Sequence, residues 1–183
     1  MRTIHCISVV WLLSISVLGT ALAQTPMRPE IAQLFVGVWR ATPSGIYTED
    51  AEGKRFYPFG ETAQARFILT AEGYAANSLQ FKDRAICANG TSPRHCTTQE
   101  AEAALQTASS YQYRYRFEPD IDNPYKGKMI WDVDLSVYPN WVGKSLTRRY
   151  EMTPDGSKWM FLAPLPANPQ LGLKVFLERE KPN

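Results

Sequence analysis

Histidine is scarce in this sequence, and its scarcity excludes a large class of catalytic mechanisms. The 183 residues contain two histidines, His5 and His95. His5 lies in an apolar N-terminal stretch and His95 in a loop between two cysteines, so the body of the domain has no histidine for a catalytic triad. The sequence also lacks a glycine-rich phosphate loop, a G-x-S-x-G elbow, an H-E-x-x-H motif and a dinucleotide fingerprint. We therefore expect no catalytic residue of these classes, no metal site and no cofactor.

Net charge is also nearly absent. The chain has 20 basic and 18 acidic residues, a formal net charge of +2. This balance gives no electrostatic basis for binding nucleic acid or an anionic membrane. Beyond the N-terminal stretch, no apolar run reaches the roughly 20 residues that a spanning helix needs. We expect no nucleic-acid partner and no membrane span, and the pattern makes no prediction of the oligomeric state.

The N-terminal residues predict a secretory signal peptide. One early cation, Arg2, precedes an apolar run from Ile7 to Leu18, and small residues follow up to Ala23. This order is typical of a signal peptide that is cleaved before Gln24. A membrane anchor is the alternative, but the apolar run is short for one. The protein is therefore expected to be exported, to a Gram-negative periplasm or as a secreted protein.

Cleavage would divide the chain into three parts. Residues 1–23 form the signal peptide, residues 24–33 a flexible N-terminal segment, and residues 34–183 one domain. The loss of Arg2 leaves 19 basic against 18 acidic residues. A chain of this length can bury about two-thirds of its unfolded surface in one core.

Two cysteines remain after cleavage, Cys87 and Cys96, in the segment CANGTSPRHC. An oxidising compartment favours a disulfide between them. The alternative is a metal site that includes His95, but one short loop without a second ligand cluster makes a poor zinc site. We favour the disulfide.

Alternating apolar and polar residues predict a chain made mostly of β-strands. In YQYRYRFEP, Tyr111, Tyr113, Tyr115 and Phe117 fall on one face and polar residues on the other, which is the period of a strand. Residues 128–138 alternate in the same way. We expect eight strands in all. Most connections are expected to be short, with longer ones at residues 45–63 and 164–172.

One helix is predicted after the third strand. Thr97 caps it and Glu100 completes a capping box ahead of an alanine-rich run. Consecutive antiparallel strands with one apolar face must bury that face, and eight of them can close into a barrel without exposed edges. The predicted fold is therefore all-β, an eight-stranded up-and-down antiparallel barrel with one inserted helix. A β-sandwich is the alternative.

Several motifs together resemble the bacterial and fungal lipocalin-like domain family. They are VGVWR, YPFG, FILTAEGYAA, DLSVYPNWVGKSLTRRYEM and the final FLER, and they span Leu34 to Arg179. The resemblance implies a lipocalin-like, calycin-type barrel. It also implies that Trp39 of the G-x-W motif packs against Arg179 at the closed end. Trp141 in the Tyr-Pro-Asn-Trp corner is expected to fold across one end of the barrel as a plug, or to stack on a ligand at the mouth.

Which strand face lies inside remains open at this point. In one orientation the aromatic face of residues 111–117 is inside, and arginines and aspartates form a salt-bridged outer surface. In the other, Asp132, Arg114 and Arg148 lie inside an apolar cup, where a carboxylate beside an arginine suits acid–base work. The predicted ligand-binding residues are drawn from both faces: Phe67, Tyr74, Tyr113, Tyr115, Trp131, Asp132, Arg148 and Tyr150.

Two functions follow from this pattern. The first is a binding protein that holds a small apolar or aromatic molecule in the barrel. The second is a cofactor-free cyclase or isomerase, as the resemblance suggests, with Asp132, Arg148 and Tyr150 as its candidate groups. Binding is favoured, and an inward carboxylate would favour the enzyme.

Overall fold

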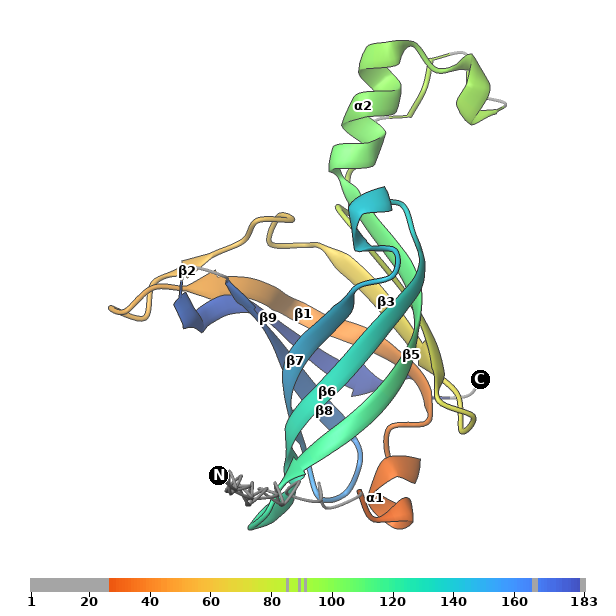
Figure 1. The fold of residues 1–183 in the computed structure, drawn as a ribbon. Helices are drawn as coiled ribbons and strands as arrows, with labels where there is room; N and C mark the ends of the chain where they lie inside the picture. The colour runs from red at the N-terminus through yellow and green to blue at the C-terminus, as the bar shows by residue number, and fades with distance from the viewer. Residues whose placement is uncertain (1–26, 85, 89, 91, 166–167, 182–183) are drawn as a thin grey trace, which may run out of the picture.

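The computed structural model describes residues 27–181 except 85, 89, 91 and 166–167, so the predicted signal peptide lies outside the described residues. Eight strands pair antiparallel with their neighbours, and β1 also pairs with β9, which closes the sheet into a barrel (Figure 1). The barrel strands are β1 (Gly37–Glu49), β3 (Gln64–Leu69), β4 (Tyr74–Gln80), β5 (Ala108–Asp120), β6 (Asn123–Ser136), β7 (Ser145–Met152), β8 (Lys158–Leu165) and β9 (Asn168–Arg179). The predicted up-and-down barrel is confirmed, and the sandwich is excluded because one closed sheet is formed.

The remaining elements are not part of the closed barrel. The two-residue strand β2 (Arg55–Phe56) pairs only with β1 in the described sheet. Helix α2 (Thr98–Gln106) follows β4, which is the third barrel strand as predicted and the fourth strand in chain order. Its capping box is present, since Thr97 and Glu100 exchange side-chain to backbone hydrogen bonds.

Two predicted connections are instead strand. Strand β1 continues to Glu49 through a register shift between Ala41 and Ile46, so residues 45–49 pair rather than loop out. Pro43, Gly45 and Ser44, whose φ is 50°, lie in this irregular stretch and let the strand bend. Strands β8 and β9 pair through Pro164 with Gly172 and, after a register shift, Leu165 with Asn168, so most of the proline-rich segment 164–172 belongs to the sheet.

Helix α2 and the loop before it project away from the barrel at its open end (Figure 1). Cys87 and Cys96 form the expected disulfide, with their Cα atoms 5.2 Å apart. None of the described residues of α2 is buried. Arg84 fastens the base of this projection, because its guanidinium donates to Ala104 O at 2.8 Å and to Thr107 Oγ1 at 3.2 Å. The projection is therefore held at its base and contributes little to the core.

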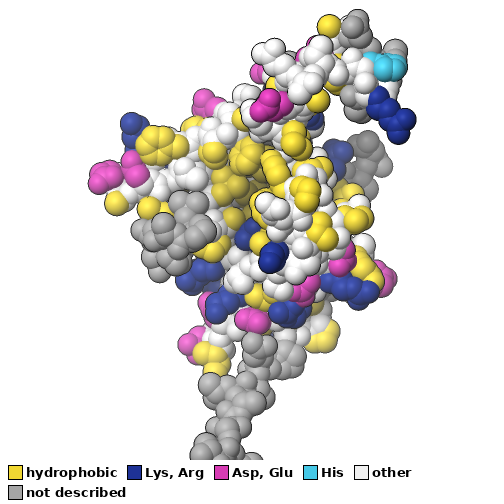
Figure 2. All heavy atoms as spheres, turned by 45° about the horizontal axis from the view of Figure 1, so that its top comes forward, with side chains coloured by type: hydrophobic (Ala, Val, Ile, Leu, Met, Phe, Trp, Pro, Cys, Tyr) yellow, Lys and Arg dark blue, Asp and Glu magenta, His cyan; other side chains and the backbone are white. Residues whose placement is uncertain are grey.

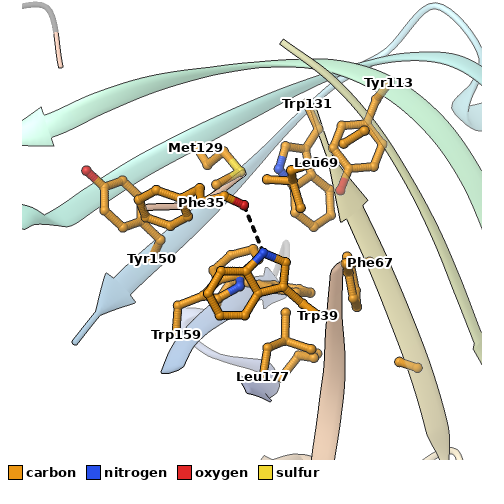
Figure 3. Close-up of a cluster of buried hydrophobic side chains, with 14 of the residues drawn as sticks. Phe35, Trp39, Phe67, Leu69, Tyr113, Met129, Trp131, Tyr150, Trp159 and Leu177 are labelled. Carbon is orange, nitrogen blue, oxygen red and sulfur yellow. Dashed lines mark hydrogen bonds between the residues drawn. The ribbon is translucent and has the colours of Figure 1, made fainter. Parts of the chain in front are cut away.

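The opposite end of the barrel is sealed. The short helix α1 (Pro29–Gln33) lies beneath it, and Ile31 of α1 is buried, so the packed unit includes part of the segment expected to be flexible. The indole Nε1 of Trp39 donates to Phe35 O at 2.8 Å (Figure 3). The guanidinium of Arg179 lies 4.3 Å from the centre of the Trp39 ring, which confirms the pairing that the resemblance implies.

Candidate ligand-binding site

The aromatic face of β5 points into the barrel. Tyr111 and Tyr113 are buried, whereas Arg114 and Arg116 are exposed. Strand β6 follows the same rule, with Trp131 and its alternate neighbours buried. This is the first of the two orientations that the sequence left open.

Tyr113 and Trp131 form the aromatic floor of the open half. Their rings stack with centroids 4.5 Å apart and an interplanar angle of 23°. Phe67 of β3 meets the Trp131 ring at a centroid distance of 6.4 Å (Figure 3). Phe161 of β8 meets it at 5.0 Å. Three of these residues, Phe67, Tyr113 and Trp131, were predicted from the sequence, and the barrel brings them together.

Two other predicted residues lie nearer the closed end. The Tyr150 ring packs edge-on against Phe35 at 5.3 Å, and its hydroxyl donates to Pro124 O at 3.2 Å. The Tyr115 hydroxyl donates to Thr70 O in the turn between β3 and β4. Both hydroxyls therefore already have protein acceptors, and these residues support the core rather than the open half.

Polar atoms from four consecutive strands face this aromatic interior. Asn77 Oδ1 of β4, Tyr113 Oη of β5, Trp131 Nε1 of β6 and Arg148 Nε of β7 are buried and have no hydrogen-bond partner among the described residues. Trp159 Nε1, in the closed half, is a fifth such atom. A buried polar group without a partner costs about 1–3 kcal/mol, so most such groups in proteins are satisfied. Four such atoms on adjacent strands make this region the candidate ligand-binding site.

Arg148 is the charged member of this group. It is in register with the buried Met129 across β6 and β7, so its side chain starts from the inner face. Its guanidinium lies 5.0 Å from the centre of the Trp131 ring, and Nη1 donates to Thr147 O at 3.0 Å. Within the part of the chain that the structure describes, Arg148 forms no ion pair. The sequence placed Arg148 inside only in the second orientation, together with Arg114 and Asp132. The structure has the first orientation, and Arg148 nevertheless starts from the inner face.

Trp141 lies at the open end of the barrel, against Tyr111. It belongs to the short 3-10 helix η2 (Pro139–Trp141), is half-buried, and meets the Tyr111 ring edge-on at 5.2 Å. Hydrophobic side chains gather around a hollow at this end (Figure 2). The expected plug is therefore at the mouth, where it packs against Tyr111 and Tyr138.

A family model for the lipocalin-like domain matches residues 36–169, more than half of the chain. The chain belongs to the lipocalin-like domain family. A comparison with curated protein sequences gave no match. Among solved structures, the tryptamine complex of the amine-binding protein of Rhodnius prolixus is similar, with 15% identity and a TM-score of 0.43 over 81% of this chain and 64% of that one.

Tyr74 and Asp132, also predicted for the cavity wall, lie on the outer surface of the lipocalin-like barrel. Tyr74 is 44% exposed and lies under the guanidinium of Arg114. Asp132 accepts hydrogen bonds from Arg116 and from Ser145. Period two explains both positions: each residue alternates with a buried strand neighbour. We leave both out of the interior site.

The interior of the lipocalin-like barrel holds no acid to match Arg148. Over residues 27–181 as described, the buried polar side chains are Asn77 and Ser109, and no aspartate or glutamate is buried.

The described helices include none long and apolar enough to cross a membrane. Two hollows of about 680 and 840 Å³ lie on the outer side near Arg40, beside its ion pair with Glu178.

Sequence reasoning missed Asn77 and Tyr111. Asn77 alternates with the buried Ala75 and Leu79, and Tyr111 is in register with Asn77 across β4 and β5. The alternation that placed Tyr113 inside also applies to Tyr111, so the signal was present in the sequence. The role of Asn77 depends on Tyr111 of the neighbouring strand β5, so the sequence of β4 alone did not predict it.

Burial keeps the inner tyrosines neutral. It raises the pKa of Tyr111, although the nearby Arg148 charge and Asn77 act in the opposite direction. It raises the pKa of Tyr113 well above the ordinary value. A neutral hydroxyl retains its proton and can donate it in a hydrogen bond.

We expect the fold to weaken in alkaline solution. Burial and the Glu72 charge raise the pKa of Tyr115 to about 12, and Tyr113 is also raised. A group whose pKa is higher in the folded state contributes stability that is fully present below its unfolded value, about 10. That stability is lost as the pH rises from about 10 through 12. Ultraviolet absorbance of tyrosinate, followed together with circular dichroism, measures this.

The expected trace has two steps, and the second coincides with unfolding. The control is protein in denaturant, in which the tyrosines ionise together. If all tyrosines of the native protein ionised in one step near pH 10 with the circular dichroism unchanged, burial of the inner hydroxyls would be contradicted.

Proposed function

We propose that this lipocalin-like protein binds a small, mainly aromatic or apolar molecule in the open half of its barrel. One observation carries the proposal. Four buried polar atoms on adjacent strands have no protein partner within the described chain, and they surround an aromatic floor. Ligand pockets typically combine an apolar wall with a few placed polar groups. A bound molecule with an apolar body and hydrogen-bonding groups would satisfy both.

Entry would require Trp141 to move. The Trp141 ring lies against Tyr111 and Tyr138, at centroid distances of 5.2 Å and 5.0 Å. The 3-10 helix η2 is one turn long and is followed by Gly143, whose φ is 75°. Gly143 N donates to Val133 O at 2.9 Å, so the movement would be confined to the mostly exposed residues before Gly143. We propose that η2 opens to admit the ligand and that Trp141 then closes over it.

Binding is preferred to turnover because of Asp132. The cyclase or isomerase reading needs a placed acid beside Arg148 in the interior. Asp132 lies outside, paired with Arg116, and Tyr150 donates to a backbone carbonyl near the closed end. The interior that remains is aromatic with hydrogen-bond donors, which suits holding a molecule.

We also propose that the protein is exported. The N-terminal pattern of Arg2, the apolar run and the small residues before Gln24 supports this. The disulfide between Cys87 and Cys96 is compatible with an oxidising compartment. N-terminal sequencing of the protein recovered outside the cytoplasm should begin at Gln24.

Native mass spectrometry tests the binding proposal. The protein is expressed with its own N-terminal residues and recovered from the exported fraction. We expect a complex with one small molecule, which denaturation releases for identification. The same protein, unfolded, stripped and refolded, is the control, and it should recapture that mass from an extract of the host. A protein that is empty when isolated and captures nothing after refolding would contradict the proposal.

A further inference from the structure

We propose that the molecule bound in the barrel carries a carboxylate or a similar oxyanion, and that Arg148 is the residue that holds it. This inference rests on the proposed function and narrows it to one class of ligand, planar apolar or aromatic organic acids. It rests on the positive charge of Arg148 in the interior, a charge that a neutral apolar ligand would leave without a partner.

Arg148 differs from the other inner residues of its strand. Leu146, Tyr150 and Met152 share its face of β7, and each is hydrophobic and packs in the core. An arginine at such a position must either reach water or find a counter-charge, because burying a charge without one is costly. The Arg148 side chain is only partly exposed and its Nε is buried.

Other arginines of the described chain show what this one lacks. Arg40 pairs with Glu178 at 2.8 Å, and Arg66 pairs with Glu180 at 2.7 Å. Arg179, at the closed end, donates to three backbone carbonyls. Arg148 has the backbone acceptor Thr147 O, the hydroxyl of Tyr111 beside it, and the face of Trp131. A guanidinium offers five N–H donors, so most of its capacity is unused by the described residues.

The groups around Arg148 are mostly donors. Tyr113 keeps its hydroxyl proton because burial raises its pKa. The indole N–H of Trp131 can only donate. The Asn77 amide can donate or accept after rotation about its last bond. Two neutral donors beside one unpaired cation form a surface complementary to an anion, since charge-assisted hydrogen bonds to an oxyanion are about twice as strong as neutral ones.

Aromatic rings restrict the rest of the ligand. Tyr113 and Trp131 are fully buried against each other. The nearest less buried rings are therefore those of Tyr111, beside Arg148, and half-buried Trp141, which meet edge-on at 5.2 Å. A planar body would lie against these rings while its acid group reached the guanidinium, which binds carboxylates in a bidentate geometry. A neutral apolar molecule would fill the same space but leave Arg148 without a partner.

A pair of matched fluorescent probes tests the inference. Anilinonaphthalene sulfonate and N-phenylnaphthylamine share one aromatic skeleton, and only the first carries an anionic group. The sulfonate stands in for the ligand's carboxylate. We expect wild-type protein stripped of ligand to bind both probes, and the anionic one more tightly. Fluorescence titration gives each dissociation constant.

The decisive variant is Arg148→Met, which keeps the length and apolar character of the side chain and removes its charge. We expect it to weaken binding of the anionic probe by about tenfold to hundredfold, the range for a hydrogen bond to a charged group. Binding of the neutral probe should stay the same or tighten. Arg148→Lys should restore part of the preference for the anion.

Arg149→Met is the matched control. Arg149 is the next residue of β7, is exposed, and points to the opposite face, so the variant makes the same change in net charge outside the barrel. It should leave both dissociation constants unchanged. Equal losses in the two Arg variants would mean that the anionic probe senses only the overall charge, and that would overturn the inference.

A stability measurement separates a ligand-holding role from a structural one. Replacing an unpaired, partly buried charge by an apolar side chain of similar size is often neutral or stabilising. We therefore expect the melting temperature of ligand-free Arg148→Met to equal or exceed that of the wild type. A clear fall would assign Arg148 to the fold, and the inference would fail.

The outcomes also distinguish this inference from the proposed function. If the wild type binds the neutral probe, and Arg148→Met leaves the preference between the probes unchanged, the barrel binds small molecules but Arg148 does not select acids. If the wild type binds neither probe, the proposed function fails and this inference fails with it.

Discussion

Replacing Trp39 by alanine should destabilise the protein by about 3–5 kcal/mol, the usual cost of removing a large aromatic side chain from a core. Trp39 is fully buried and meets the Trp159 ring edge-on at 6.0 Å. Its loss would leave a cavity at the closed end and would remove the hydrogen bond to Phe35 O. Urea denaturation followed by circular dichroism gives the free energy of unfolding of both proteins.

Trp141→Ala is the control for this prediction. Trp141 is only half-buried and lies at the open end, so its removal should cost less, about 1 kcal/mol, as is common for point substitutions outside the core. If the two alanine variants lost similar free energies of unfolding, Trp39 would contribute no more to stability at the closed end than Trp141 does at the mouth.

Replacing Arg179 by alanine should have the second largest effect on stability, a loss of about 2–4 kcal/mol. Arg179 donates to Leu34 O, to Val36 O at 2.8 Å and to Gly156 O at 3.2 Å, which ties α1 and the β7–β8 turn to the last strand. Hydrogen bonds to a charged group contribute about 1.5–3 kcal/mol each, and such contributions are not additive. Urea denaturation measures this loss as well.

Arg40→Ala is the matched control for Arg179. Both arginines lie on the paired strands β1 and β9, but the Arg40 side chain is 61% exposed and makes a surface ion pair with Glu178. Surface ion pairs contribute about 0–1 kcal/mol, so this variant should change little. A double variant of Trp39 and Arg179 should show coupling of about 0.5–2 kcal/mol from the cation over the indole. Additive losses would mean that the ring contact contributes nothing.

The two ends of the barrel therefore have different physical characters. At the closed end Trp39 and Arg179 donate to backbone carbonyls, and Trp159 Nε1 is the one buried polar side-chain atom there without a partner among the described residues. The open half leaves the Trp131 indole and the Arg148 guanidinium without full partners among the described residues. Local departures from the rules of stable folding are expected at functional sites. This contrast supports placing the ligand near β4 to β7.

Some errors in the predicted site had a local cause. Trp131 and Asp132 are consecutive residues of one strand, so period two puts them on opposite faces and both cannot line the interior. Tyr74 was favoured because it is aromatic. Its strand neighbours settle its side, since Ala75, Asn77 and Leu79 are the buried ones. Alternation was a better guide in these strands than residue type.

The sequence by itself determined most of the strands and which residues share a strand face, because alternation along a strand is a local property. Which of the two faces is buried was decided by the tertiary structure. The sequence also determined the capped helix between the third and fourth barrel strands, the cysteine pair and the closed-end motif of Trp39. Only the tertiary structure decided which residues meet in the open half. Asn77, Tyr111, Trp131 and Arg148 come from four strands, and their meeting depends on strand register and closure of the barrel. Those are non-local pairings, which no single segment of the chain encodes.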